Sequence, residues 1–66
     1  MTKFVIHALT NGTKVALQAP GQTAERALWN VRRKRLARNA GTFLVYERKT
    51  GNLVLAVNGD RRIPNL

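Results

Sequence analysis

The dipeptide Asn11-Gly12 constrains this chain most, because it stands between two extended and largely apolar runs. A two-residue type I′ turn requires positive φ at both central positions, and Asn-Gly adopts that conformation readily. Pairing outward from the turn sets Ile6 opposite Leu17. We therefore predict a β-hairpin over residues 3–18, whose inward face carries Phe4, Ile6, Ala8, Val15 and Leu17.

The stretch that follows Pro20-Gly21 has the pattern of an amphipathic helix. Thr23 is a suitable N-cap, and Glu25 stands in the first turn, where a carboxylate interacts favourably with the helix dipole. We predict a helix from about Ala24 to Arg38, ended by residues 39–41. Its buried face should centre on Leu28, with Ala24, Val31 and Leu36 flanking it and Trp29 at the rim.

A second hairpin is predicted over residues 42–59, with Lys49-Thr50-Gly51 as its turn. Glycine in the third position fits a type I turn closed by a glycine bulge, which pairs Arg48 with Asn52. The inward set would then be Phe43, Val45, Leu53, Leu55 and Val57. Residues 60–66 show no periodicity and contain a proline, so we expect a mobile basic tail without a further strand.

The order hairpin, helix, hairpin predicts an α+β fold. We expect the arrangement β-β-α-β-β, with a four-stranded mixed sheet, one helix across one face, and the first and last strands adjacent and parallel. Over residues 3–58 this layout resembles the β-grasp fold of ubiquitin and of the immunoglobulin-binding domains of protein G. That fold hosts many unrelated functions, so the resemblance implies none. A length of 66 residues suits one compact domain, here residues 1–59.

The charge balance is the strongest functional signal in the composition. Twelve Lys and Arg residues against three acids give a formal net charge of +9. Arg32, Arg33, Lys34, Arg35 and Arg38 place five cations within seven positions, with no acid among them. Ordinary solvated faces mix the two signs, so we interpret this cluster as a binding surface for a polyanion.

Other residues would extend this surface or add to it. Arg48, Lys49, Arg61 and Arg62 could lengthen the positive strip, and Trp29 and Tyr46 could stack on bases. The sheet face away from the helix should carry an apolar patch, formed by Val5, Leu9, Leu44 and Val54. A patch of this size on a small chain predicts a partner or a second copy that covers it.

Catalysis, metal binding and cofactor binding are not expected. The chain has no cysteine, and its single histidine, His7, has no Ser, Cys or Asp beside it in the sequence. The three acids, Glu25, Glu47 and Asp60, fall on different predicted segments, and the glycines form no nucleotide-binding motif. No apolar stretch is long enough to span a membrane, and the lack of cysteine suits a cytoplasmic protein.

Two functions fit these observations. The first is a small basic protein that grips the phosphates of nucleic acid, DNA rather than RNA, with little sequence specificity, because no helix-turn-helix, zinc-finger or RNA-recognition pattern is present. The alternative is an interaction module, for example a phage-encoded inhibitor, that docks on an acidic host-protein surface. We expect the first function.

Overall fold

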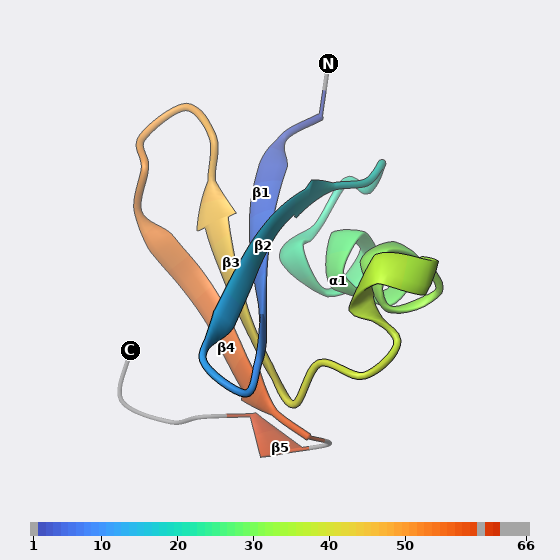
Figure 1. The fold of residues 1–66 in the computed structure, drawn as a ribbon. Coiled ribbons are helices and arrows are strands. Elements are labelled where there is room, and N and C mark those ends of the chain that lie inside the picture. Colours follow the sequence, from blue (N-terminus) through green and yellow to red (C-terminus); the bar gives the residue numbers. More distant parts are fainter. Residues whose placement is uncertain (1, 60, 63–66) are drawn as a thin grey trace.

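The computed structural model describes residues 2–59, 61 and 62. Within this part of the chain, one sheet of five strands packs against one α-helix (Figure 1). The elements are β1 (Phe4–Thr10), β2 (Thr13–Gln18), α1 (Ala24–Arg32), the 3₁₀ turn η1 (Arg35–Ala37), β3 (Thr42–Glu47), β4 (Leu53–Asn58) and β5 (Arg61–Arg62). The strand order is β2-β1-β3-β4-β5, and every neighbouring pair is antiparallel.

The prediction of a four-stranded mixed sheet was wrong, although the α+β order of the main elements is as expected. Strand β3 lies between β1 and β4 and is antiparallel to both, so the first and fourth strands run in the same direction but are not neighbours. The link to β3 explains the difference: the backbone N–H of Gly41 donates to the Leu9 carbonyl at 3.0 Å, which delivers β3 directly to the free edge of β1. A β-grasp sheet would leave that edge for the last strand, so the resemblance ends at the order of elements.

The short strand β5 also corrects the prediction of a tail without a strand. Arg61 pairs with Asn58 and Arg62 with Val57, after a tight turn in which Gly59 has a φ of 65°. Two residues are too few to show an alternating pattern, so no hydrophobic periodicity indicated this strand. The remainder of the predicted tail, residues 60 and 63–66, lies outside the described residues.

The first hairpin confirms its predicted register. Asn11 and Gly12 both have positive φ, 49° and 83°, as a type I′ turn requires, and Ile6 lies opposite Leu17. Four of the five predicted inward residues are buried, and Val15 is partly buried against them. The turn chemistry therefore fixed both the register and the face that enters the core.

The second hairpin follows its predicted register only over part of its length. Phe43 lies opposite Val57 and Val45 opposite Leu55, but the register then shifts so that Tyr46 lies opposite Leu53. The N–H of Glu47 donates to the Asn52 carbonyl instead of the predicted pairing between Arg48 and Asn52. As a result Leu53, predicted to point inward, is 36% exposed and does not join the core.

Helix α1 begins where predicted and ends six residues early. The Thr23 side chain accepts a hydrogen bond from the Arg26 N–H, as an N-cap should. The helix stops at Arg32, and Lys34 is extended, with ψ at 146°. Continuing the helix would stack five cations at spacings where like charges repel, and would carry the chain past the edge where β3 must start.

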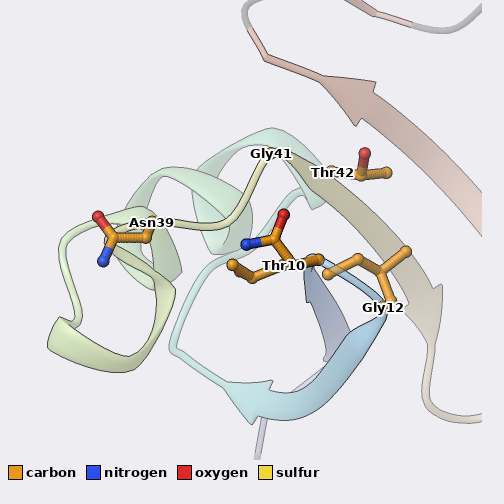
Figure 2. A pocket seen from close by; sticks show the side chains of 7 residues that line it. Thr10, Gly12, Asn39, Gly41 and Thr42 are labelled. Atoms are coloured by element: carbon orange, nitrogen blue, oxygen red, sulfur yellow. The ribbon is translucent and has the colours of Figure 1, made fainter.

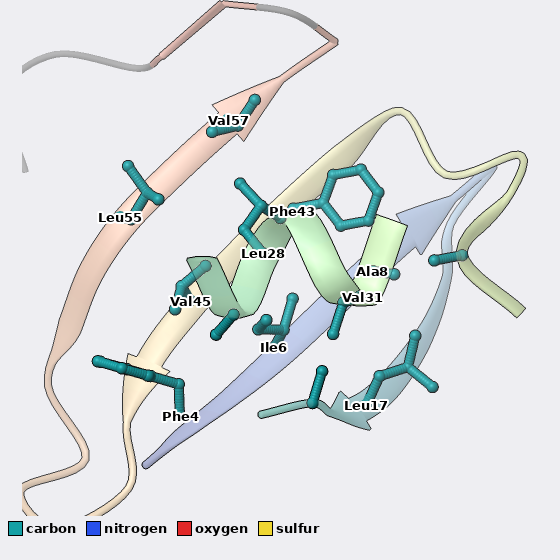
Figure 3. Packing of buried hydrophobic residues seen from close by; sticks show 13 residues of the cluster. Phe4, Ile6, Ala8, Leu17, Leu28, Val31, Phe43, Val45, Leu55 and Val57 are labelled. Carbon is teal, nitrogen blue, oxygen red and sulfur yellow. The ribbon is translucent and has the colours of Figure 1, made fainter. Parts of the chain in front are cut away.

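The early end of α1 changes which side chains are buried. Ala37 of η1 is buried, whereas Leu36, predicted to flank the core, is 69% exposed. Leu28 and Val31 of α1 pack on the sheet between β1 and β3, as Figure 3 shows. The fully buried centre is formed by Ile6, Val31 and Val45.

Candidate nucleic-acid interface

Residues 26–38 form a surface with one sign of charge. It contains Arg26, Arg32, Arg33, Lys34, Arg35 and Arg38, all exposed, and no acid. We call these six residues the α1–η1 surface. Arg26 and Arg32 belong to α1, Arg33 caps its C-terminal end, and the others surround η1. The predicted cluster is thus a helix end and a 3₁₀ turn, and not one continuous helix.

Trp29 organises part of the α1–η1 surface. Its side chain is 52% exposed, and the guanidinium carbons of Arg26 and Arg33 lie 5.4 and 4.9 Å from its ring centroid. Such cation–π contacts limit the freedom of both arginines without removing their charge. A base that stacks on this ring competes with the two guanidinium groups, so Trp29 serves first as their support.

Arg26 was missing from the predicted site. The signal that identifies it is the spacing of residues 26, 29 and 33, which places the three side chains on one side of a helix. Arg26 therefore belongs to the candidate site because it contacts Trp29, even though it lies apart from the other cations along the chain.

Arg32 ties the helix to the sheet. Its guanidinium group lies 5.4 Å from the centroid of the buried Phe43 ring and donates to the Gly59 carbonyl at 3.2 Å. The apolar stem of the side chain packs while its head stays near water, as expected for an arginine at the rim of a core. Arg32 thus has a structural role in addition to its charge.

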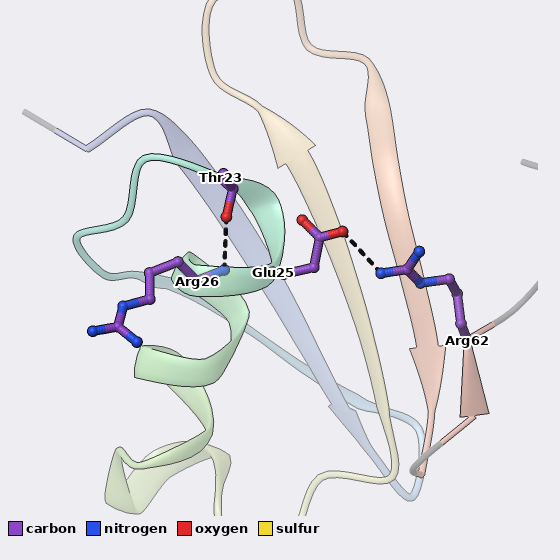
Figure 4. A network of polar contacts seen from close by, with 4 residues as sticks. All are labelled: Thr23, Glu25, Arg26 and Arg62. Carbon is purple, nitrogen blue, oxygen red and sulfur yellow. Dashed lines mark hydrogen bonds and ion pairs between the residues drawn. The ribbon is translucent and has the colours of Figure 1, made fainter.

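The cation at the end of β5 is already engaged. Arg62 donates to Glu25 at 2.8 Å across the gap between β5 and the start of α1, as Figure 4 shows. The carboxylate also accepts a hydrogen bond from its own backbone N–H. These hydrogen bonds, with the positive charge of Arg62, hold the pKa of Glu25 below its ordinary value. Arg62 is therefore paired with Glu25, although both side chains remain exposed.

Two of the predicted cations lie at the other end of the sheet. Glu47 is opposite Phe4, so the turn that carries Arg48 and Lys49 lies at the start of β1, whereas η1 lies near its end. Arg48 donates to the side chain of Gln18 at 3.2 Å. Arg48 and Lys49 thus lie at the opposite end of the sheet from η1, on the side where Gln22 precedes α1.

Tyr46 and the predicted apolar patch lie on the sheet face away from α1, which we call the outer face. The centroid of the Tyr46 ring is 4.9 Å from that of the His7 ring. The adjacent residues along the two strands, Ile6, Ala8 and Val45, belong to the core, so these two rings point to the other side of the sheet. Trp29 and Tyr46 therefore cannot stack on one ligand group. The patch residues Val5, Leu9 and Leu44 are half-buried, and Val54 is exposed.

An open hollow of about 610 Å³ adjoins the α1–η1 surface at the turn of the first hairpin. Thr10, Gly12, Asn39, Gly41 and Thr42 line it, as Figure 2 shows. A second hollow of about 370 Å³ continues from it to Arg35 and Leu36. The first hollow offers hydroxyl, amide and backbone groups but no acid or base, so it can form hydrogen bonds without supplying proton transfer.

Within the described residues, His, Asp and Glu side chains do not gather in a group of three that could hold a metal ion. None of the helices described there is long and apolar enough to cross a membrane.

Comparison with known proteins gives no assignment: no family model, curated protein or solved structure matches the chain. The function must therefore be argued from the surfaces of the molecule.

Proposed function

We propose that this chain is a nucleic-acid-binding protein that holds the phosphates of duplex DNA on its α1–η1 surface, largely without reading sequence. One observation carries the proposal. Six exposed cations occur within residues 26–38 without an acid, and an exposed tryptophan holds two of them. A surface kept solely for solubility would mix the signs of its charges.

The physical basis is the release of counterions. Each phosphate that a lysine or arginine neutralises frees condensed cations from the DNA, so affinity falls steeply as salt rises. Arginines held on Trp29 lose less side-chain freedom on binding than unrestrained ones. Contacts of this kind position a protein on the duplex but carry no sequence information.

A charge-matched pair of variants tests the proposal. The first variant combines Arg33→Gln, Lys34→Gln and Arg38→Gln, and the second combines Lys3→Gln, Arg48→Gln and Lys49→Gln at the far end of the sheet. Both remove three positive charges from the formal +9. Affinity for a short DNA duplex is measured by fluorescence anisotropy between about 0.05 and 0.2 M salt, where the counterion effect is large.

We expect the log–log salt slope of the first variant to flatten by nearly one unit for each lost phosphate contact. The second variant should keep the slope of the unchanged chain. Equal losses in the two variants would mean that net charge alone attracts DNA, without a site. If the unchanged chain fails to bind duplex DNA or RNA at about 0.05 M salt, the proposal is wrong, and docking on an acidic protein surface takes its place.

A further inference from the structure

The two central strands present aromatic rings on the outer face. His7 lies in the middle of β1 and Tyr46 near the end of β3, and their ring centroids are 4.9 Å apart. The ring planes are tilted by 53°, so the rings do not lie flat on each other. Both residues are half-buried, so each side chain keeps part of its surface open to solvent. A ligand with flat faces would contact that open part.

The residues around these rings make a shallow floor. Ala16 lies opposite His7 on β2, and Ala56, which is 1% exposed, lies opposite Leu44 on β4. Val5, opposite Tyr46, and Leu44, opposite His7, are half-buried. The exposed Leu53 of β4 lies opposite Tyr46, and no described helix or strand covers this face (Figure 1).

The charge of the outer face selects an anionic ligand. Lys14 lies opposite Leu9 in the outward row, and the guanidinium group of Arg48 bonds to Gln18, which lies opposite Val5 in the same row. Glu47 is opposite Phe4 in the inward row, and Glu25 is on α1, so neither described acid lies on this face. A second copy would bring the same cations into contact, which opposes pairing through this face.

Aromatic rings between cations fit unpaired bases better than an acidic protein. Every base has a flat π-face that stacks on aromatic side chains, and single strands run a negative backbone beside those bases. Sheets with aromatic residues on adjacent central strands bind single-stranded nucleic acid in this way. An acidic protein surface would instead be bound best if the cations, and not the aromatic rings, lay at the centre of the outer face, because its carboxylates pair with cations.

We propose that the outer face binds a single-stranded nucleic-acid segment, with bases stacked on Tyr46 and His7 and the backbone passing Lys14 and Arg48. This site lies on the opposite side of the sheet from the α1–η1 surface. It goes beyond the proposed function and does not depend on duplex binding.

The test compares ring with non-ring substitutions. Affinity for a labelled oligothymidine, and for an abasic strand of equal length, is measured for the unchanged chain, Tyr46→Phe and Tyr46→Leu. Phenylalanine keeps a ring, whereas leucine keeps only apolar area, and thermal melting establishes that each variant is folded. Emission from Tyr46, the single tyrosine, is recorded in a Trp29→Phe variant, where it is free of tryptophan emission.

We expect Tyr46→Leu to weaken oligothymidine binding by about 5- to 150-fold and Tyr46→Phe to retain most of it. The abasic strand should bind weakly to every variant, and oligothymidine should quench Tyr46. Combined with Trp29→Phe, the variant that lacks Arg33, Lys34 and Arg38 should keep this quenching even if it loses duplex DNA, which separates the two proposals.

Three results would each overturn the inference. The first is equal binding of oligothymidine and the abasic strand. The second is equal affinity of Tyr46→Leu and Tyr46→Phe. The third is a stable dimer in sedimentation that Val5→Lys dissociates, because a second copy would then cover the face.

Discussion

Arg62 and Glu25 join the last described strand to the first turn of α1 through one exposed ion pair. The pKa of Glu25 is lowered by its backbone hydrogen bond, by the hydrogen bond from Arg62 and by the charge of that side chain. We predict that Arg62→Gln raises the pKa of Glu25 toward its ordinary value, because two of these three causes disappear. An NMR titration of the Glu25 carboxyl carbon measures the change.

The sign of the pH effect follows from the direction of this shift. A carboxyl whose pKa is lower in the folded chain stabilises the fold above its unfolded pKa, and that contribution is lost as pH falls through the folded pKa. Arg61→Gln is the matched control, since it removes an equal charge from the same strand, and we expect Glu25 to respond less. A pKa of Glu25 unchanged in Arg62→Gln would show that the backbone hydrogen bond alone sets it.

At the scale of the element, α1 gives a direct contrast between two leucines. Leu28 is buried among β1, β3 and β4 residues, and Leu36 is 69% exposed. We predict that Leu28→Ala lowers the free energy of unfolding by about 2–5 kcal/mol, because a cavity replaces its side chain. Leu36→Ala should change it by less than about 0.5 kcal/mol. Chemical denaturation measures both.

If Leu36→Ala costs as much as Leu28→Ala, then α1 continues to Arg38 in solution and buries Leu36. Small losses for both leucines would instead mean that the helix docks through another face. Val31→Ala separates these outcomes, because Val31 is fully buried in the structure. A large loss of stability means that this face of the helix docks on the sheet, and a small loss means that another face does.

The elements that the sequence predicted correctly are those whose signals are local. Asn11-Gly12 sets a hairpin register within a few residues, and Thr23 starts a helix through one hydrogen bond. The end of α1 and the position of β3 depend on which edge of the sheet is free, which no local pattern records. The register shift between β3 and β4 near Tyr46 likewise reflects a conflict between the pairing that the turn favours and the pairing along the strands. Tertiary packing decided each of these features.

For the candidate site, sequence predicted the residue type better than the arrangement. The cations at residues 32–38 are exposed as expected, but Arg48 and Lys49 lie at the far end of the sheet and Arg62 is paired with Glu25. Trp29 and Tyr46 lie on opposite sides of the sheet. Spacing along one helix can be read from the sequence, whereas distances between elements follow from strand order, which was predicted wrongly.

At the scale of the whole molecule, the net charge opposes the fold that carries it. The molecule measures 28 × 27 × 18 Å and has a formal charge of +9. At about 0.01 M ionic strength the Debye length is about 30 Å, so every cation repels every other, whereas at about 0.15 M it is about 8 Å and only neighbours interact. Self-repulsion therefore destabilises the compact state most at low salt.

We predict that the thermal midpoint rises between these two salt concentrations, while affinity for DNA falls over the same range. A rise of a few degrees is expected, because about 1 kcal/mol shifts the midpoint of so small a domain by roughly 4–8 °C. The variant that lacks Arg33, Lys34 and Arg38 should begin at a higher midpoint in low salt and rise less. Calorimetry at the two salt concentrations measures the midpoints of the unchanged chain and of the variant. A midpoint that falls with salt would show that attractive pairs such as Glu25–Arg62 outweigh the repulsion among the cations.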